Sequence, residues 1–332
     1  MKNNIKKDNQ AKLDISAEKI VENMTTSKQY NLFKDAMMRL FANKLAVIGM
    51  IIIMTLIFVA IFGPNLTPYD FLTQDLSIRN QGISINHLFG TDDLGRDVLS
   101  RIIYGARTAV IIAFSITIMS FIIGVVMGSI AGYAGGKVDH AITWLMDIIM
   151  SIPSLLLVIV LNVSLKPPIT NWMNDLYLST QNSFFRETIW VDFILVFGSL
   201  SLIKWPKAGR IIRGQLLSVR NQNYVVAAKA IGVPTSKIIS RYVVPNCLGP
   251  IIVMISATLG EAMVMESAFS FLGVGVRPPM PSWGNMIRDG LRVWHIYPHL
   301  LVAPAAVLAI VIIAFSFLGD GVNDAMNPRQ WK

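Results

Sequence analysis

Long apolar runs are the feature of this sequence that most limits the folds open to it. A helix needs about 20 apolar residues to cross the hydrocarbon of a bilayer. We predict six membrane-spanning segments: Leu45–Phe62, Ala109–Ala131, Ala141–Leu161, Ile189–Ile203, Leu248–Phe271 and Leu300–Leu318. The fourth is the shortest of them. Charged residues make up only 15% of the 332 residues, too few to cover a soluble domain of this length. The sequence therefore predicts an all-α membrane protein with the lipid bilayer as its solvent.

The remaining segments divide the chain further. Residues 1–29 are polar and of mixed charge, and we expect them to form a flexible cytoplasmic tail. Over residues 30–44, large apolar side chains recur at helical spacing between Lys and Arg, which predicts an amphipathic helix at the membrane interface. The alternative is a soluble helix that packs on a partner. The transmembrane domain is expected over 45–319, with an external loop over 64–108, and a second cytoplasmic tail over 320–332.

A basic stretch over residues 204–247 predicts the orientation in the membrane. It contains no Asp or Glu, and its cations are Lys204, Lys207, Arg210, Arg213, Arg220, Lys229, Lys237 and Arg241. Short loops rich in Lys and Arg stay in the cytoplasm, so six crossings place both termini there too. The net charge of +9 does not indicate a nucleic-acid partner, because the basic residues lie beside the apolar runs.

The same stretch carries a motif of small residues. It reads YVVAAKAIGVPTSKIISRYVVPN from Tyr224 to Asn246. We predict a short helix over Tyr224–Ile231, which Gly232 would end, with Pro234 just beyond it. A second short helix would follow, and the pair would lie flat under the membrane and fit a cleft on a partner. The alternative is an ordinary amphipathic connector.

These residues and three other stretches resemble a known family. The small residues and the spacing to Pro245-Asn246 resemble the "EAA" loop of ABC importer permeases. The stretches are HLFGTDDLGRDVLSRIIYGAR from His87, SAFSFLGVGVRPPMPSWG from Ser267, and WPKAGRIIRGQLL from Trp205. They resemble the C-type permease subunits of the peptide/nickel class, over about Tyr30 to the end of the chain. One departure is Val226, which stands where the Glu of that motif is expected.

The resemblance implies a type I importer permease with six transmembrane helices in the bacterial cytoplasmic membrane. It further implies a second homologous permease, two cytoplasmic ATPases that bind ATP and Mg, and an extracytoplasmic solute-binding protein. The chain itself would need no cofactor and no metal, and its cargo would be a peptide or, alternatively, nickel or a metallophore. The residues implied in coupling to an ATPase are Tyr224, Ala227, Ala228, Lys229, Gly232, Pro234, Arg241 and Pro245.

Acidic residues inside apolar runs are candidates for function, because a charge in hydrocarbon is costly. Glu261 is predicted to line the substrate path together with Met263 and Met265, whose adaptable side chains suit varied peptides. Packing against lipid or neighbouring helices is the alternative. Glu266 and Asp147 are expected to be structural, as buried pairs or helix caps.

A cluster of acidic residues and a histidine before the second predicted segment could suggest a metal site. His87, Asp92, Asp93 and Asp97 are close in sequence, but a folded external cap with Asp97 paired to an Arg is favoured over a metal site. No phosphate loop, H-E-x-x-H or G-x-S-x-G motif is present, so the chain is not expected to be an enzyme or to bind ATP itself. An ion-coupled secondary transporter is the main rival, and a membrane-embedded enzyme is the third possibility.

Overall fold

The computed structural model describes residues 32–186, 189–219, 222–230, 232–234, 237 and 244–326. These residues form helices and one isolated antiparallel bridge, between Thr91 and Asp97. The α-helices are α2 (Leu32–Ala42), α3 (Lys44–Leu66), α4 (Val98–Ala134), α5 (Gly136–Ser151), α6 (Ser154–Thr180), α7 (Ile189–Val219), α8 (Asn223–Ala230), α10 (Val244–Phe271), α11 (Trp283–Leu291) and α12 (His299–Met326). Two short 3₁₀ turns, η1 (Leu76–Ile78) and η2 (Ser183–Arg186), lie in the connections.

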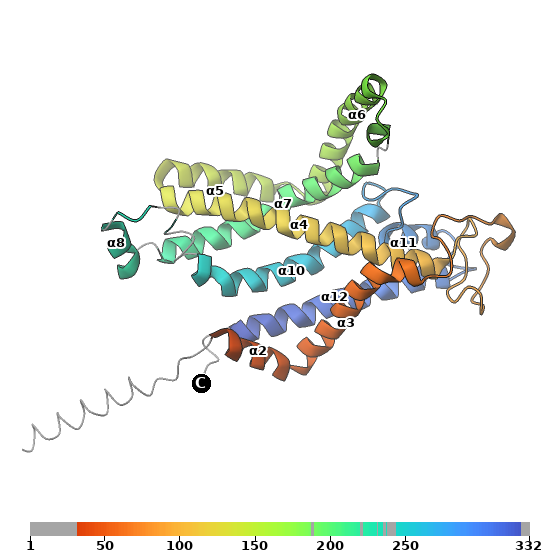
Figure 1. Ribbon diagram of the computed structural model, residues 1–332, viewed down its shortest axis with the longest axis horizontal. Coiled ribbons are helices and arrows are strands. Elements are labelled where there is room, and N and C mark those ends of the chain that lie inside the picture. The colour runs from red at the N-terminus through yellow and green to blue at the C-terminus, as the bar shows by residue number, and fades with distance from the viewer. Residues whose placement is uncertain are drawn as a thin grey trace, which may run out of the picture.

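The long helices run between two ends of an elongated bundle (Figure 1). One end carries α2, α8 and the end of α12, and α2 contacts α12 there. The opposite end carries the connection between α3 and α4 together with α11. The first described helix and the end of the last one therefore lie at the same end of the bundle as α8, as an even number of crossings requires.

Five described helices are long and apolar enough to cross a membrane: α3, α4, α6, α12 and the part of α10 from Pro250 to Phe271. Helix α7 is not counted among these five. It has 31 residues, however, and packs along α4 over the largest helix–helix interface of the molecule. With α5 and α6 taken as one crossing, α7 completes the six crossings of the predicted permease fold (Figure 1).

Helix α3 shows how these spans divide their surface. Its buried residues include Gly49, Ile53 and Leu56, which recur every three or four positions. Ile51 and Met54, on the other side, remain 59% and 62% exposed. This division of a wholly apolar helix into a packed face and an exposed apolar face is expected where lipid replaces water.

Polar N-cap residues fix where the first two spanning helices, α3 and α4, begin. The side-chain oxygen of Asn43 accepts hydrogen bonds from Leu45 N and Ala46 N, so α3 begins directly after α2. The Asp97 carboxylate accepts from Ser100 N at 2.7 Å, and α4 begins at Val98. The external loop predicted over 64–108 was therefore too long at both ends, because α3 continues to Leu66 and α4 starts well before residue 109.

The third predicted segment is two helices rather than one. Pro153 disfavours helical backbone at the residue before it, and Ile152 is extended, with φ −83° and ψ 129°. Helix α5 ends there and α6 begins at a new angle (Figure 1). The third predicted segment ended at Leu161, but α6 continues to Thr180 and stops where Gln181 adopts a left-handed conformation.

Two other boundaries were also too short. The fourth predicted segment ended at Ile203, but α7 continues to Val219, so more than a third of the predicted coupling loop belongs to this helix. The sixth predicted segment ended at Leu318, but α12 continues to Met326. Both predicted segments stopped at the first charged residues. Charged residues do not by themselves end a helix, because they can remain helical and form ion pairs with neighbouring helices.

Glycines bring α4 and α7 close together. Gly124, Gly128 and Gly132 are spaced by one helical turn along α4. A Cβ on Gly124 or Gly128 would collide with the α7 backbone at Gly209, and one on Gly132 would lie 2.8 Å from Leu216 Cδ2. Close packing of this kind replaces the hydrophobic driving force that two helices lack in lipid. It fixes α7 as a rigid element at the centre of the molecule.

Candidate functional site

The predicted coupling helix is present as α8. Val225 and Ala228 are buried in a cluster with Ile212 and Leu216 of α7 and Ile251 of α10. On the other face, Val226 is 54% exposed, and Ala227 and Ala230 are also exposed. The helix is therefore anchored to the two helices that flank it in the sequence while a surface of small and apolar residues stays open.

Gly232 ends this segment in the predicted way. Its φ is +77°, and Val233 N donates to the Ala228 carbonyl at 3.0 Å, which is the hydrogen bond that closes a Schellman motif. Among the described residues, and apart from its two chain neighbours, no atom lies within 4 Å of a Cβ built on Gly232. The positive φ is thus the feature of the described structure that favours Gly here.

The other predicted coupling residues are described only in part. Pro234 is exposed. Tyr224 and Lys229 lie on α8 and Pro245 on the first turn of α10, with nothing described of their side chains. Arg241 and the expected second short helix lie outside the described residues. The role of all these residues in coupling stays a prediction.

The middle of the α7–α10 surface holds a cluster of three charges. Lys204 Nζ donates to Glu261 Oε2 at 2.6 Å, and Lys207 Nζ donates to Glu261 Oε1 at 2.7 Å. Glu261 is therefore not an isolated charge, because two cations from the predicted coupling loop lie on α7 and pair with it. Whether this cluster lines the substrate path stays a prediction.

The two methionines predicted beside Glu261 differ in burial. Met263 is 1% exposed and lies in the main core cluster, so it cannot contact a substrate in this conformation. Met265 is partly buried and packs against the same core. Residues two apart on a helix lie on different faces, which is why Met263 does not share the exposed face of Glu261, whereas Met265, four residues along, lies on the same side as Glu261. The prediction of a methionine-lined path is corrected for Met263.

Below the cluster, the remaining cations of α7 pair with α5. Arg210 forms an ion pair with Asp147, and Arg213 pairs with Asp139 through Nη2 and Oδ2 at 2.7 Å as well as through Nε. Because successive cations are three residues apart, their direction rotates around α7, from α10 toward α5. The expected structural role of Asp147 thus takes the form of an exposed pair rather than a buried one.

The end of the bundle that carries α11 is held together by Glu266 (Figure 1). This residue is fully buried, and its carboxylate accepts from Ser270 Oγ and Ser282 Oγ, both at 2.7 Å, and from Ser267 Oγ at 3.3 Å. Ser282 is also the N-cap of α11 and accepts from Gly284 N. Glu266 therefore ties α11 to α10, which agrees with the structural role expected for it.

The packing role of Trp283 was not predicted from the sequence. This residue is fully buried and donates from Nε1 to the Ile102 carbonyl of α4 at 3.0 Å. Its ring lies over Gly105, where a Cβ would be 2.9 Å from Trp283 Cδ1. The only sequence signal for this contact is Gly105, a Gly inside a helical segment, which leaves room for a large side chain. Together with Glu266, this contact joins α4, α10 and α11 at one end of the bundle.

The acidic stretch before α4 forms a folded cap, as predicted. Asp92 accepts from Leu94 N and Arg96 N, both at 2.9 Å, and from Arg96 Nε at 2.7 Å. Asp97 pairs with His87 Nδ1 at 2.9 Å instead of with an Arg, which corrects the expected partner. No group of three metal-ligating residues suited to an ion occurs in the part of the chain that the structure describes.

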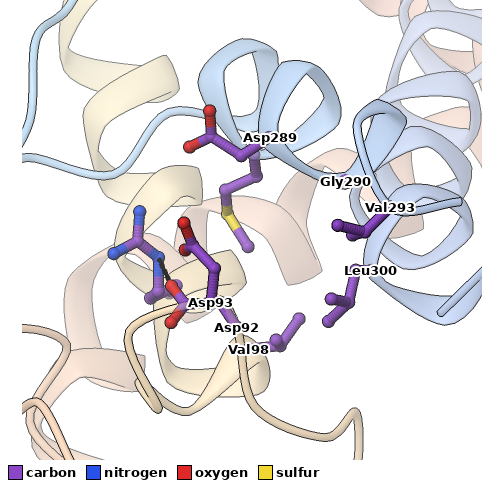
Figure 2. A pocket seen from close by; sticks show the side chains of 9 residues that line it. Asp92, Asp93, Val98, Asp289, Gly290, Val293 and Leu300 are labelled. Atoms are coloured by element: carbon purple, nitrogen blue, oxygen red, sulfur yellow. Dashed lines mark ion pairs between the residues drawn. The ribbon is translucent and has the colours of Figure 1, made fainter. Parts of the chain in front are cut away.

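A small cavity of about 30 Å³ lies beside this cap (Figure 2). Asp92, Asp93 and Asp289 line one side, and apolar residues such as Val98 and Leu300 line the other. Arg101 also lines it, with Nε 3.5 Å from Asp92 Oδ2. A volume of this size accommodates about one water molecule. The cavity is therefore too small for a peptide and belongs to the structure of the cap.

Comparisons with known proteins agree with this architecture. The family described as "Binding-protein-dependent transport system inner membrane component" matches residues 124–332, and "N-terminal TM domain of oligopeptide transport permease C" matches residues 31–82. The chain belongs to this family of membrane permeases. Such a permease is a transport subunit rather than an enzyme.

Individual relatives cover nearly the whole chain. The oligopeptide transport system permease protein OppC of Bacillus subtilis is 37% identical over 95% of this chain and 94% of its own length. The dipeptide transport system permease protein DppC of Alkalihalophilus pseudofirmus is 35% identical over 90% of both chains. The DppC of Bacillus subtilis is 35% identical over 89% of this chain and 85% of its own.

Proposed function

We propose that this chain is a transmembrane subunit of an ATP-driven importer and forms half of a path for peptides. The observation that carries the proposal is the similarity over nearly the whole chain to permeases named for oligopeptide and dipeptide transport. Because these names specify peptides, peptide cargo is favoured over nickel or a metallophore. The substrate would arrive from an extracytoplasmic binding protein, and a second homologous permease would supply the other half of the path.

Energy for transport would come from two partner ATPases that bind ATP and Mg, with no cofactor in this chain. Helix α8 supports this proposal by its geometry. Its buried face is tied to α7 and α10, while Ala227 and Ala230 remain exposed. A push on the exposed face would therefore be transmitted to both helices as a rigid movement. No nucleic acid takes part in this scheme.

The end of the bundle that carries α8 would face the bacterial cytoplasm, and both chain termini would lie there. The charges support this orientation, since Arg210 and Arg213 lie toward that end of α7 and short basic segments stay inside. The exposed apolar face of α3 would contact lipid, and the cap before α4 would face the binding protein.

Uptake into vesicles tests this function. The assembled importer, with both permeases, both ATPases and the binding protein, is reconstituted and supplied with a labelled peptide. We expect uptake that requires ATP and both ATPases and that persists when an ionophore removes ion gradients. Uptake driven by a proton or sodium gradient without ATPases would replace the proposal with an ion-coupled transporter, and ATP-driven uptake of nickel but not of peptide would replace the cargo.

A further inference from the structure

The charge cluster of α7 and α10 has an excess of positive charge. Lys204 and Lys207 share the single carboxylate of Glu261, so the three groups sum to +1. Within the described residues, these two lysines form no ion pair with any other carboxylate. The next cation along α7, Arg210, is already compensated by Asp147.

The cluster is accessible near the centre of the bundle. Lys204 is residue 16 of the 31 in α7, about 22 Å from either end at a rise of 1.5 Å per residue. Its side chain is 14% exposed, whereas those of Lys207 and Glu261 are 49% and 40% exposed. Lys204 therefore supports the carboxylate from within, and Lys207 presents its ammonium to the surface.

The surface around Glu261 is unlike the lipid-facing side of α3. Along α10 the exposed residues at helical spacing from Glu261 are Ala257, Val264 and Ala268, two of which are alanines. Ile51, Met54 and Phe58 occupy the equivalent face of α3. A half-exposed set of charges is costly in hydrocarbon, so this face adjoins water or a partner. Small side chains leave room beside the charges for a ligand.

We propose that Lys207, held in place by Glu261 beside Lys204, binds the carboxylate of a peptide as it passes through the importer. This assignment rests on the proposed function and adds a subsite to it. An ammonium has three donors, and Lys207 uses one of them for Glu261. The free donors and the excess charge suit a carboxylate, either at the carboxyl terminus of the peptide or on an Asp or Glu side chain.

The shared carboxylate also explains why such a site would release its ligand. Two uncompensated lysines would hold an anion tightly, whereas Glu261 leaves an excess of only +1. Sites within a transport path must bind well enough to admit a ligand and weakly enough to let it leave. Glu261 is thus a positioning residue that orients Lys207 and limits the strength of binding.

The test measures uptake of matched peptides by the complete reconstituted importer. One neutral peptide is used as the free acid and as the carboxyl-terminal amide, and a third peptide is an amide that carries one Asp. Each uptake rate of a variant is divided by the wild-type rate for the same peptide. The preference of the binding protein cancels in that quotient, because the binding protein is unchanged.

We expect Lys207→Gln to lower the quotient for the free acid about tenfold relative to that for the amide, as loss of one charge-assisted hydrogen bond in a partly solvated site predicts. Lys207→Arg should retain the discrimination. Lys137→Gln, the same change at an exposed position on α5, should alter no quotient. A selective loss for the Asp-bearing amide alone would assign the site to acidic side chains instead of the terminus.

Equal quotients for all three peptides in Lys207→Gln, whether lowered or unchanged, would overturn the subsite. A lower yield of the two-permease complex with equal quotients would place the cluster at the permease interface. These outcomes differ from failure of the proposed function, in which the wild-type importer itself would take up none of the peptides with ATP.

Discussion

Glu261 and Glu266 lie on the same helix, about one and a half turns apart, but they differ in burial and in the charge of their hydrogen-bond donors. Glu266 is fully buried and accepts hydrogen bonds from three serine hydroxyls. Glu261 is half-buried and accepts from the ammonium groups of Lys204 and Lys207. The same residue type in the same apolar segment thus joins two elements in one case and forms part of an accessible charged surface in the other.

The difference shows that an acid in a membrane segment is not by itself a sign of function. A buried carboxylate with neutral donors is satisfied locally, and its neighbours Ser270 and Ser282 have little freedom to accept a new ligand. A half-exposed carboxylate between two cations leaves charge that a ligand can use. Exposure and the charge of the partners distinguish the two roles, and neither is visible in the local sequence.

Removing the buried carboxylate should have the largest effect on the protein itself. Glu266→Leu leaves the hydroxyls of Ser270 and Ser282 buried without their acceptor, and each such group costs about 1–3 kcal/mol. We expect much less purified complex and a clearly lower midpoint of thermal unfolding in detergent. Glu261→Gln serves as the matched control, and an equal loss of stability in both variants would remove the contrast between the two acids.

A variant at α8 should abolish transport of every substrate while the chain still inserts. Gly232→Trp places a large side chain on an exposed helix end with φ of +77°, where a partner is proposed to dock. We expect ATP-dependent uptake at background level, with normal amounts of chain in the membrane.

Gly232→Asn is the control for α8, because Asn tolerates this backbone conformation without adding bulk. It should retain most of the uptake. Normal transport by Gly232→Trp would remove the coupling role of this segment. The pattern of equal loss for all peptides also provides a reference for a defect that is not selective.

Neutralising the exposed acid should change selectivity rather than stability. Glu261→Gln removes the negative charge between Lys204 and Lys207 and raises the charge of the cluster from +1 to +2. We expect the ratio of free-acid to amide peptide uptake to shift a few-fold, in the direction opposite to that of Lys207→Gln. A uniform fall in uptake, together with loss of complex, would assign Glu261 the structural role that Glu266 has.

Single-cysteine substitutions at exposed positions should leave transport unchanged. Labelling them reports which side of the membrane each end of the bundle faces. In a chain whose Cys247 is replaced, cysteines at Gln81 and Ser179 should react with an impermeant reagent from outside. A cysteine at Gln222, beside α8, should react only after permeabilisation. Reaction of Gln222→Cys from outside would invert the orientation and place Glu266 at the cytoplasmic end.

The sequence by itself determined the class of protein. Apolar length and the helical period are local properties, so the helices around Leu45–Phe62 and Leu248–Phe271 were predicted at nearly their observed positions, whereas α4 was predicted to start eleven residues too late. The turn at Gly232 was also predicted, because a left-handed residue after a short helix has a local signature. The motifs around His87 and Ser267 identified the family for the same reason.

Only the tertiary structure decided what the charges do. Lys204 and Lys207 looked like the start of a loop, and their partner Glu261 is more than fifty positions away in the sequence. Met263 was predicted to contact substrate beside Glu261, but it is buried in the main core cluster. Ion pairs and burial depend on which helices lie side by side. That arrangement follows from long-range contacts such as the glycines of α4 against α7, which no window of local sequence contains.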